Sequence, residues 1–283
     1  MNKKKVKSGK LERKGNTGAV IIMLFFCVIV LLPILWMIST SIKIDSEMVA
    51  AVPRWIPETP SLVAYQRFFK DYPFLMQLKN TVIYTLCSTI LIVICACFAG
   101  YGVTRFEFRG KNAFMSFLLV TQMFPSVMLL VPFYNVIKSL GLLNTYIGMI
   151  LVYISISVAF ATWMMMGFFK SIPLELDEAA IIDGCSRFQT FLKVIMPLTL
   201  PGIASVAIFS FITGWNEYMF TSILTTQANM QTITIGITSL NGERVMWNDM
   251  MAASVISSIP LVIVFMFLQK YFVSGMTSGA VKG

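Results

Sequence analysis

The stretch NTVIYTLCSTILIVICACFAGYGVT, residues 80–104, contains no Asp, Glu, Lys or Arg. About 20 such residues in a helix are enough to cross the hydrocarbon core of a membrane. Hydrophobic residues make up 57% of the chain and charged residues only 12%, and the mean hydropathy is +0.78. Further charge-free runs of this length occur at residues 15–42, 112–137, 139–169, 194–216 and 250–269. The sequence therefore predicts an all-α integral membrane protein with six transmembrane helices.

The six helices are expected to form one domain, residues 15–283 with a core at 76–271, after a basic tail at 1–14. We place them at about 18–41, 80–103, 113–137, 146–169, 200–223 and 251–271. Continuous apolar runs differ from the alternating pattern of a β-barrel, the other structure that satisfies the backbone in lipid. A seventh charge-free run, 218–242, is rich in Thr, Gln and Asn, so we expect a loop there with some strand character at 232–237.

The distribution of Lys and Arg predicts that both termini lie in the cytoplasm. With six crossings, 15 of these residues fall on the side of the termini and 7 on the other, and basic residues favour the cytoplasmic side. The first apolar run is longer than the core of a signal peptide, so we expect an uncleaved anchor. The net charge of +9 suits contact with anionic lipid. No basic patch is interleaved with stacking aromatic residues, so nucleic acid is not an expected partner.

Several kinds of chemistry are excluded by composition. The chain has no histidine, which removes the usual general base and most zinc sites. Its 5 cysteines fall in predicted spans or on the cytoplasmic side, where disulfides are rare. The Gly-Lys pairs lack the upstream Gly and following Ser or Thr of a phosphate-binding loop. We therefore expect no catalytic residues, no metal site and no bound cofactor, and a transport protein rather than an enzyme.

A polar segment at 170–197 interrupts the apolar runs on the expected cytoplasmic side. Pro173 suits the first position of a helix, and the acidic residues after it suit the positive end of the helix dipole. Gly184 is typical of a helix C-terminus, and Ser186-Arg187-Phe188-Gln189 matches a capping box for a second helix. The segment is therefore expected to be a helix, a break and a second helix. A simple connection between two spans would have the same pattern.

This segment resembles the EAA loop of the membrane subunits of ATP-binding-cassette importers. Glu178-Ala179-Ala180 is followed after three residues by Gly184, and after nine more by Val194-Ile195-Met196-Pro197. The family has Ile-x-Leu-Pro at the last position. The resemblance implies a type I importer permease fold, in which the loop forms a coupling helix seated in a cleft of a separate ATPase. The coupling residues would be Glu178, Ala179, Ala180, Asp183, Gly184, Met196 and Pro197.

Further stretches look like the carbohydrate-uptake branch of that family, and most like the shorter permease subunit of maltose and maltodextrin importers. They are Gln122-Met123-Phe124-Pro125, Trp215-Asn216-Glu217 and residues 277–283. The resemblance implies a bacterial cytoplasmic membrane protein that imports an oligosaccharide by alternating access. It also implies a larger homologous permease, an ATPase dimer that binds ATP and Mg, and an extracytoplasmic solute-binding protein as partners.

Polar residues within the predicted spans are candidates for the translocation path. Glu217 is the one acid well inside a span, where an ionisable group is costly and indicates function. Asn216 and Tyr218 lie beside it, and Gln122 precedes Pro125. Glu217 could instead lie at the membrane interface, if its helix ends early, or pair with a neighbouring subunit. A gradient-driven secondary transporter is the alternative function, disfavoured by the missing histidine and the absence of inverted-repeat signs.

Overall fold

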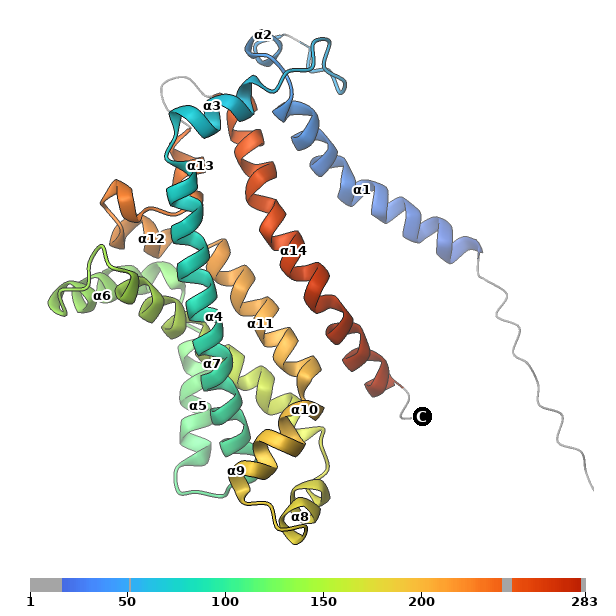
Figure 1. The fold of residues 1–283 in the computed structure, drawn as a ribbon, viewed down its shortest axis with the longest axis vertical. Coiled ribbons are helices and arrows are strands. Elements are labelled where there is room, and N and C mark those ends of the chain that lie inside the picture. The colour runs from blue at the N-terminus through green and yellow to red at the C-terminus, as the bar shows by residue number, and fades with distance from the viewer. Residues whose placement is uncertain (1–16, 51, 241–245, 281–283) are drawn as a thin grey trace, which may run out of the picture.

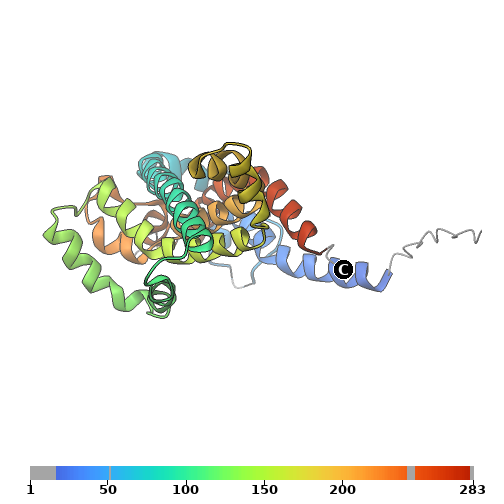
Figure 2. The ribbon, with the colours of Figure 1, turned by 90° about the horizontal axis from the view of Figure 1, so that it is seen from below.

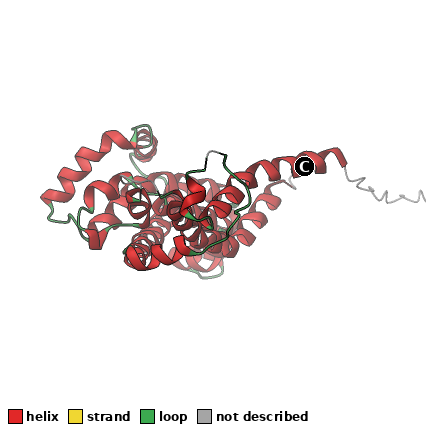
Figure 3. Cartoon of the chain, turned by 90° about the horizontal axis from the view of Figure 1, so that it is seen from above, coloured by secondary structure: helices red, strands yellow, loops and turns green. Residues whose placement is uncertain are grey.

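The computed structural model describes residues 17–50, 52–240 and 246–280, so the expected tail at 1–14 lies outside the described residues. Within those ranges every regular element is a helix (Figure 3). The first half contains α1 (Thr17–Ser41), α2 (Asp45–Met48), α3 (Val63–Asp71), α4 (Phe74–Arg105), α5 (Lys111–Thr121), α6 (Ser126–Ser139) and α7 (Tyr146–Lys170). The second half contains α8 (Glu175–Ile182), α9 (Arg187–Thr190), the π-helical turn η1 (Phe191–Ile195), α10 (Met196–Leu198), α11 (Leu200–Trp215), α12 (Met219–Leu224), η2 (Ala228–Met230), α13 (Ile233–Ser239) and α14 (Trp247–Ala280).

Four helices are long and apolar enough to cross a membrane as single rods, namely α1, α4, α7 and α14. Two bent pairs raise the number to six if each pair is one span. Helices α5 and α6 meet at 104°, and the segment Arg187–Leu198 meets α11 at 77°. The described residues thus contain four continuous candidate spans, and they reach the six that were expected if each bent pair is one broken span.

The prediction of one continuous helix at 113–137 is wrong, because the chain turns sharply between α5 and α6. Pro125 stands at the start of α6 with φ −58° and ψ 129°, outside the helical region. A proline lacks the N–H that would continue a helix, and its ring disfavours helical geometry in the residue before it. The span at 200–223 is broken as well, because α11 ends at Trp215 and α12 begins at Met219.

The expected strand character at 232–237 is also wrong, since this stretch forms the short helix α13. Contacts from α4 fix the backbone just before it. The Asn80 side chain donates hydrogen bonds to the carbonyl oxygens of Asn229 and Gln231, both at 2.9 Å, and Thr81 accepts one from the N–H of Ile233 at 2.9 Å. The β-branched residues that suggested a strand are thus overridden by tertiary packing.

The centre of the bundle is α4, which packs along α7 and α11 (Figure 1). It begins at Phe74 rather than at about 80, because buried Phe74 and Gln77 extend its contact surface. Helix α1 runs beside α14, on the opposite side of the molecule from α5 and α6 (Figure 2). The apolar side chains of α1 are exposed along its length. A helix that is hydrophobic all round needs lipid or another apolar surface around it.

Gly148 and Gly167 lie near opposite ends of α7 and together test how closely the start of that helix approaches Leu142. A Cβ on Gly148 would lie 2.3 Å from the backbone oxygen of Leu142, whereas a Cβ on Gly167 would meet nothing within 4 Å. We expect Gly148→Ala to lower the free energy of unfolding by about 1–3 kcal/mol, the usual cost of overpacking. Gly167→Ala should keep or raise stability, by up to about 1 kcal/mol. Thermal unfolding in detergent measures both, and equal midpoints would contradict the close approach.

Candidate functional site

Helix α8 ends at a left-handed glycine, as the sequence predicted. Gly184 has φ +89°. The N–H of Cys185 donates to the carbonyl of Ala180 at 3.0 Å, and the N–H of Gly184 donates to that of Ile181 at 3.0 Å. These two bonds make a Schellman motif, which favours glycine because other residues are strained at this φ. The start of the helix differs from the prediction, since α8 begins at Glu175 rather than at Pro173.

The second short helix, α9, carries the predicted capping box. The N–H of Gln189 donates to Ser186 Oγ at 3.3 Å, and the N–H of Ser186 donates to Gln189 Oε1 at 2.8 Å. The chain then passes through η1 and α10 before the 77° bend into α11. Met196 is partly buried against the core below this bend, and Pro197 is exposed. The predicted helix–break–helix is therefore confirmed.

Helix α8 has an inward and an outward face at the end of the bundle that lies opposite α3 (Figure 1). Asp177 and Ala180 are buried against the rest of the chain. Glu178, Ala179 and Asp183 are exposed. Ala180 thus faces its own bundle and is not part of the open surface, although the family resemblance places it among the residues that couple to the ATPase.

The outward face of α8 combines acid and apolar groups. Ile182 is 84% exposed, and Ile181 and Leu176 are exposed beside it. Glu175 and Glu178 lie on the same short helix and are exposed as well. Clustered exposed apolar residues rimmed by charge mark a protein-binding surface more often than a free one. The face therefore has the chemistry of a docking surface for a partner with an apolar hollow and a basic rim.

Glu217 lies in the break between α11 and α12, so its helix does end early. Its carboxylate accepts hydrogen bonds from the N–H groups of Phe220 at 2.7 Å and Thr221 at 2.9 Å, and also from the Thr221 hydroxyl. The Thr221 hydroxyl in turn meets the buried Tyr153 hydroxyl at 3.1 Å. Glu217 therefore caps α12, which explains how an acid is accommodated between the two apolar helices α11 and α12.

The other candidate path residues do not gather around that carboxylate. Asn216 and Tyr218 are exposed beside the break. Gln122 lies at the bend between α5 and α6, in a cavity of about 360 Å³ that it shares with Ser126, Ser155 and others. No hydrogen bond joins Gln122 to residues 216–218 in the part of the chain that the structure describes. The assignment of these four residues to a translocation path remains a prediction.

The cap at Glu217 can be tested against its neighbour. We expect Glu217→Ala to lower the free energy of unfolding by about 1–2 kcal/mol, the usual value of a lost N-cap. Asn216→Ala removes an exposed side chain, and its effect should stay within about 0.5 kcal/mol. Chemical unfolding in detergent, followed by tryptophan fluorescence, compares the two variants. Full stability of Glu217→Ala together with lost transport would instead make this acid a path residue.

The inward face of α8 contains a buried ion pair that no sequence pattern indicated. The guanidinium of Arg105, at the end of α4, lies 3.0 Å from the Asp177 carboxylate, and both side chains are 8% exposed. The Tyr101 hydroxyl donates to the other carboxylate oxygen at 2.8 Å. Arg105 also donates to the carbonyl of Ile172 at 2.9 Å. Arg105 could be identified from sequence only as a cytoplasmic positive charge, because its partner lies far along the chain.

A second ionic cluster lies at the α3 end of the bundle. The two terminal nitrogens of Arg67 each donate to Asp45 at 2.7 Å, and one also contacts Asp249 of α14 at 2.7 Å. Asn248 donates to Asp45 at 2.7 Å. The hydrogen bonds from Arg67 lower the pKa of Asp45 to about 2. The cluster joins the segment after α1 to both α3 and α14.

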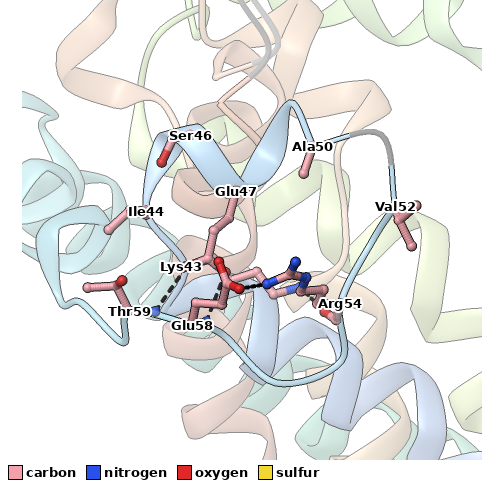
Figure 4. A pocket seen from close by; sticks show the side chains of 9 residues that line it. All are labelled: Lys43, Ile44, Ser46, Glu47, Ala50, Val52, Arg54, Glu58 and Thr59. Atoms are coloured by element: carbon pink, nitrogen blue, oxygen red, sulfur yellow. Dashed lines mark hydrogen bonds and ion pairs between the residues drawn. The ribbon is translucent and has the colours of Figure 1, made fainter.

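The segment after α1 also encloses a charged pocket of about 380 Å³ (Figure 4). Lys43 donates to the carbonyl of Arg54 at 2.6 Å, and Glu47 accepts from the N–H of Thr59 at 3.2 Å. Arg54 pairs with Glu58 across the opening. Each charged side chain of this pocket thus has a partner within the same segment, so the interactions stabilise the loop itself.

The family to which this chain belongs is known from its similarity to other proteins. Residues 92–278 match the family described as "Binding-protein-dependent transport system inner membrane component". The chain belongs to this family. The matched residues include α8, the bend before α11 and the break at Glu217. The chain is therefore a multi-pass component of an inner-membrane transport system and not an enzyme.

Individual relatives of the family are similar over most of the chain. The trehalose/maltose transport system permease protein MalG of Thermococcus litoralis is 36% identical over 264 residues, which cover 92% of this chain and 94% of that protein. The sulfoquinovosyl glycerol transport system permease protein SmoH of Agrobacterium fabrum is 33% identical, with 89% of each chain covered.

A solved structure has the same fold. It is the crystal structure of a bacterial ABC transporter involved in the import of the acidic polysaccharide alginate, and one of its chains superposes with a TM-score of 0.78. That chain is 25% identical, and the match covers 95% of this chain and 100% of that one. The predicted importer permease fold is confirmed by this likeness together with the family match.

Proposed function

We propose that this chain is the sugar-translocating permease subunit of an ATP-driven importer, and that its substrate is an oligosaccharide of the maltose and maltodextrin type. The similar proteins are named for trehalose and maltose, for sulfoquinovosyl glycerol and for alginate. All of these ligands are rich in hydroxyl groups, which supports a sugar as the class of substrate. The maltodextrin type is supported by the motifs that this chain carries at Gln122 and Trp215.

The single observation that carries the energy coupling is the outward face of α8. It presents exposed acids and isoleucines at one end of the bundle, on a helix whose C-terminus is fixed by the Schellman motif at Gly184. We infer that this face docks into a cytosolic ATPase dimer that binds ATP and Mg. The α8 end then faces the cytoplasm, in agreement with the excess of Lys and Arg on that side. Both termini lie on the same side.

Further partners follow from the family and from the exposed helices. The family name implies a solute-binding protein, which would deliver sugar to the α3 end. A larger homologous permease would cover apolar surface that this chain leaves open. The path between the two permeases would be lined by Gln122, Asn216, Glu217 and Tyr218. Broken helices at membrane depth are tolerated where they line a water-filled cavity, which supports placing the path at these two breaks.

The proposal is tested by purifying the chain from its native membrane together with its bound subunits. We expect an ATPase and a second permease to co-purify, and reconstituted vesicles to take up labelled maltotriose only with ATP and the binding protein. Vanadate should abolish this uptake. The substrates are ranked by how strongly unlabelled trehalose, raffinose or maltotriose reduces the uptake of labelled maltotriose. Uptake by the chain alone, driven by an ion gradient, would overturn the proposal in favour of a secondary transporter.

A further inference from the structure

The buried contact between α8 and α4 is unusual among the interactions of this chain. Arg105 and Asp177 are both almost wholly buried, yet they lie at an end of the bundle where an exposed pair would be easy to accommodate. A buried ion pair pays a desolvation penalty that often equals its attraction, so it contributes little to net stability. Apolar residues of similar size would contribute as much or more to the free energy of unfolding. The pair is therefore better explained by the geometry that it fixes.

The contacts around Asp177 set the orientation of α8 relative to α4. Two contacts hold the two oxygens of the Asp177 carboxylate: a hydrogen bond from the Tyr101 hydroxyl to one, and an ion pair of the other with Arg105 Nε at 3.0 Å that lacks hydrogen-bond geometry. A third, from Arg105 to the carbonyl of Ile172, holds the turn that leads into α8. Three polar contacts thus fix both the position and the rotation of α8 relative to the end of α4. Apolar packing by itself would allow α8 to slide or roll.

Tyr101 connects this polar link to the apolar core. Its ring lies 5.7 Å from that of Phe169 at the end of α7 and 4.7 Å from that of Phe191 in η1. Its hydroxyl reaches Asp177. The same side chain therefore touches the helix before α8, the segment after α8 and α8 itself, from a position on α4.

Helix α4 is suited to carry a displacement away from this link. It is a single helix of 32 residues without an internal proline. Its far end is buried as well, where the Asn80 side chain holds the backbone of Asn229 and Gln231 near the start of α13. A movement imposed at Arg105 would therefore reach the opposite end of the bundle through one continuous rod.

We propose that Arg105, Asp177 and Tyr101 are positioning residues that lock α8 to α4, so that a displacement of α8 by its partner moves α4 instead of sliding past it. This inference rests on the proposed function, because it assumes that an ATPase moves α8. It concerns the inward face of α8 and residues that do not touch the partner. Loss of the link should therefore leave docking and ATP hydrolysis in place while the imported sugar per ATP falls.

The experiment compares the full reconstituted complex with and without the link. Asp177→Asn keeps the shape and the Tyr101 bond but removes the charge, and Tyr101→Phe removes one hydroxyl while keeping the ring contacts. Arg105→Asp combined with Asp177→Arg reverses the pair. Lys170→Gln, exposed at the same end of the bundle, is the control. Labelled maltotriose uptake and phosphate release are measured on the same vesicles, with the amount of assembled complex determined for each.

We expect Asp177→Asn to lower the sugar imported per ATP by at least about fivefold, the lower end of typical coupling between sites. Tyr101→Phe should lower it less, the reversed pair should recover most of it, and Lys170→Gln should match the parent. A purely structural role would lower uptake and hydrolysis together, in proportion to the assembled complex. That result, or a parental ratio in Asp177→Asn, would overturn the inference.

Two outcomes keep this test separate from that of the proposed function. If the parent complex contains no ATPase or shows no ATP-dependent uptake, the proposed function fails first. If the parent couples normally, the variants decide the inference by themselves. Should Asp177→Asn fail to assemble, a parental ratio in Tyr101→Phe or an unrestored ratio in the reversed pair would refute the link, and the opposite results would support it.

Discussion

A chain carrying Glu178→Lys should reach the membrane in normal amounts and yet lose its ATPase. Glu178 is exposed on the outward face of α8, near Glu175 and the exposed Ile182. Reversing a charge in a complementary interface costs several kcal/mol, and each 1.4 kcal/mol is about tenfold in affinity. We therefore expect roughly a hundredfold weaker association, and loss of sugar uptake to match.

The measurement is the amount of ATPase that co-purifies with the variant, set against the amount of permease in the same membranes. Asp71→Lys makes the same change of charge on an exposed residue at the opposite end of the bundle, and it should leave the ATPase bound. Equal recovery of ATPase with both variants would remove α8 as the docking surface. Loss of the permease itself from the membrane would point to a folding role for Glu178.

Arg67→Ala should cause a large loss of stability. The Asp249 side chain is only 1% exposed, and its carboxylate forms an ion pair with Arg67. Removing one partner of a buried pair leaves an uncompensated charge and costs about 3–5 kcal/mol. Lys70→Ala, on an exposed residue one turn along α3, should change the free energy of unfolding by no more than about 0.5 kcal/mol. Thermal unfolding in detergent measures both variants.

A small effect of Arg67→Ala would show that the cluster is not required to join α14 to the segment after α1. Limited proteolysis provides a second measurement, because that segment contains Arg54 and Lys43, which trypsin can cleave once it is released. Faster cleavage in Arg67→Ala than in Lys70→Ala is the expected result. Equal cleavage would mean that Asn248, which donates to the carbonyl of Lys43 at 3.1 Å, holds the segment without Arg67.

The same cluster predicts a dependence on pH. Arg67 lowers the pKa of Asp45 from its ordinary value of 3.8 to about 2. The folded chain therefore favours the ionised carboxylate, and this stabilisation is complete above pH 3.8 and is lost as the pH falls toward 2. Unfolding midpoints from pH 5 to pH 2 should fall for the parent, and the part of this fall due to Asp45 should be missing in Arg67→Ala. Parallel curves would contradict the assignment.

The features that sequence could predict are those whose causes are local or set by the membrane. Six apolar runs predict six helical spans because the lipid leaves backbone groups no partner outside a helix, and the structure has four such helices and two bent pairs. The glycine at 184 and the capping box at 186–189 were predictable because each is completed by bonds within a few residues. The end of α8 and the start of α9 followed from these local signals, and the docking role of α8, which the family resemblance implies, stays a proposal.

The features that sequence missed depend on residues far apart along the chain. Pro125 and Glu217 mark the two breaks, but the 104° turn and the capped α12 are set by packing against other helices. The strand expected at 232–237 became a helix because Asn80 and Thr81 of α4 hold its start. Ala180 is buried because the pair between Asp177 and Arg105 turns this side of α8 toward the bundle. No pattern in a single sequence pairs those two residues.

The position of α1 also determines the order of events during synthesis. Among the candidate spans of the described residues, α1 leaves the ribosome before the others and packs beside α14, which leaves after them. At roughly 5–20 residues per second, the ribosome needs about 10–40 seconds to make the intervening chain. During this interval α1 must remain in the bilayer without its neighbour. The apolar surface of α1 is stable in contact with lipid before α14 is made. We therefore expect α1 to pack against the bundle in one of the final steps of folding.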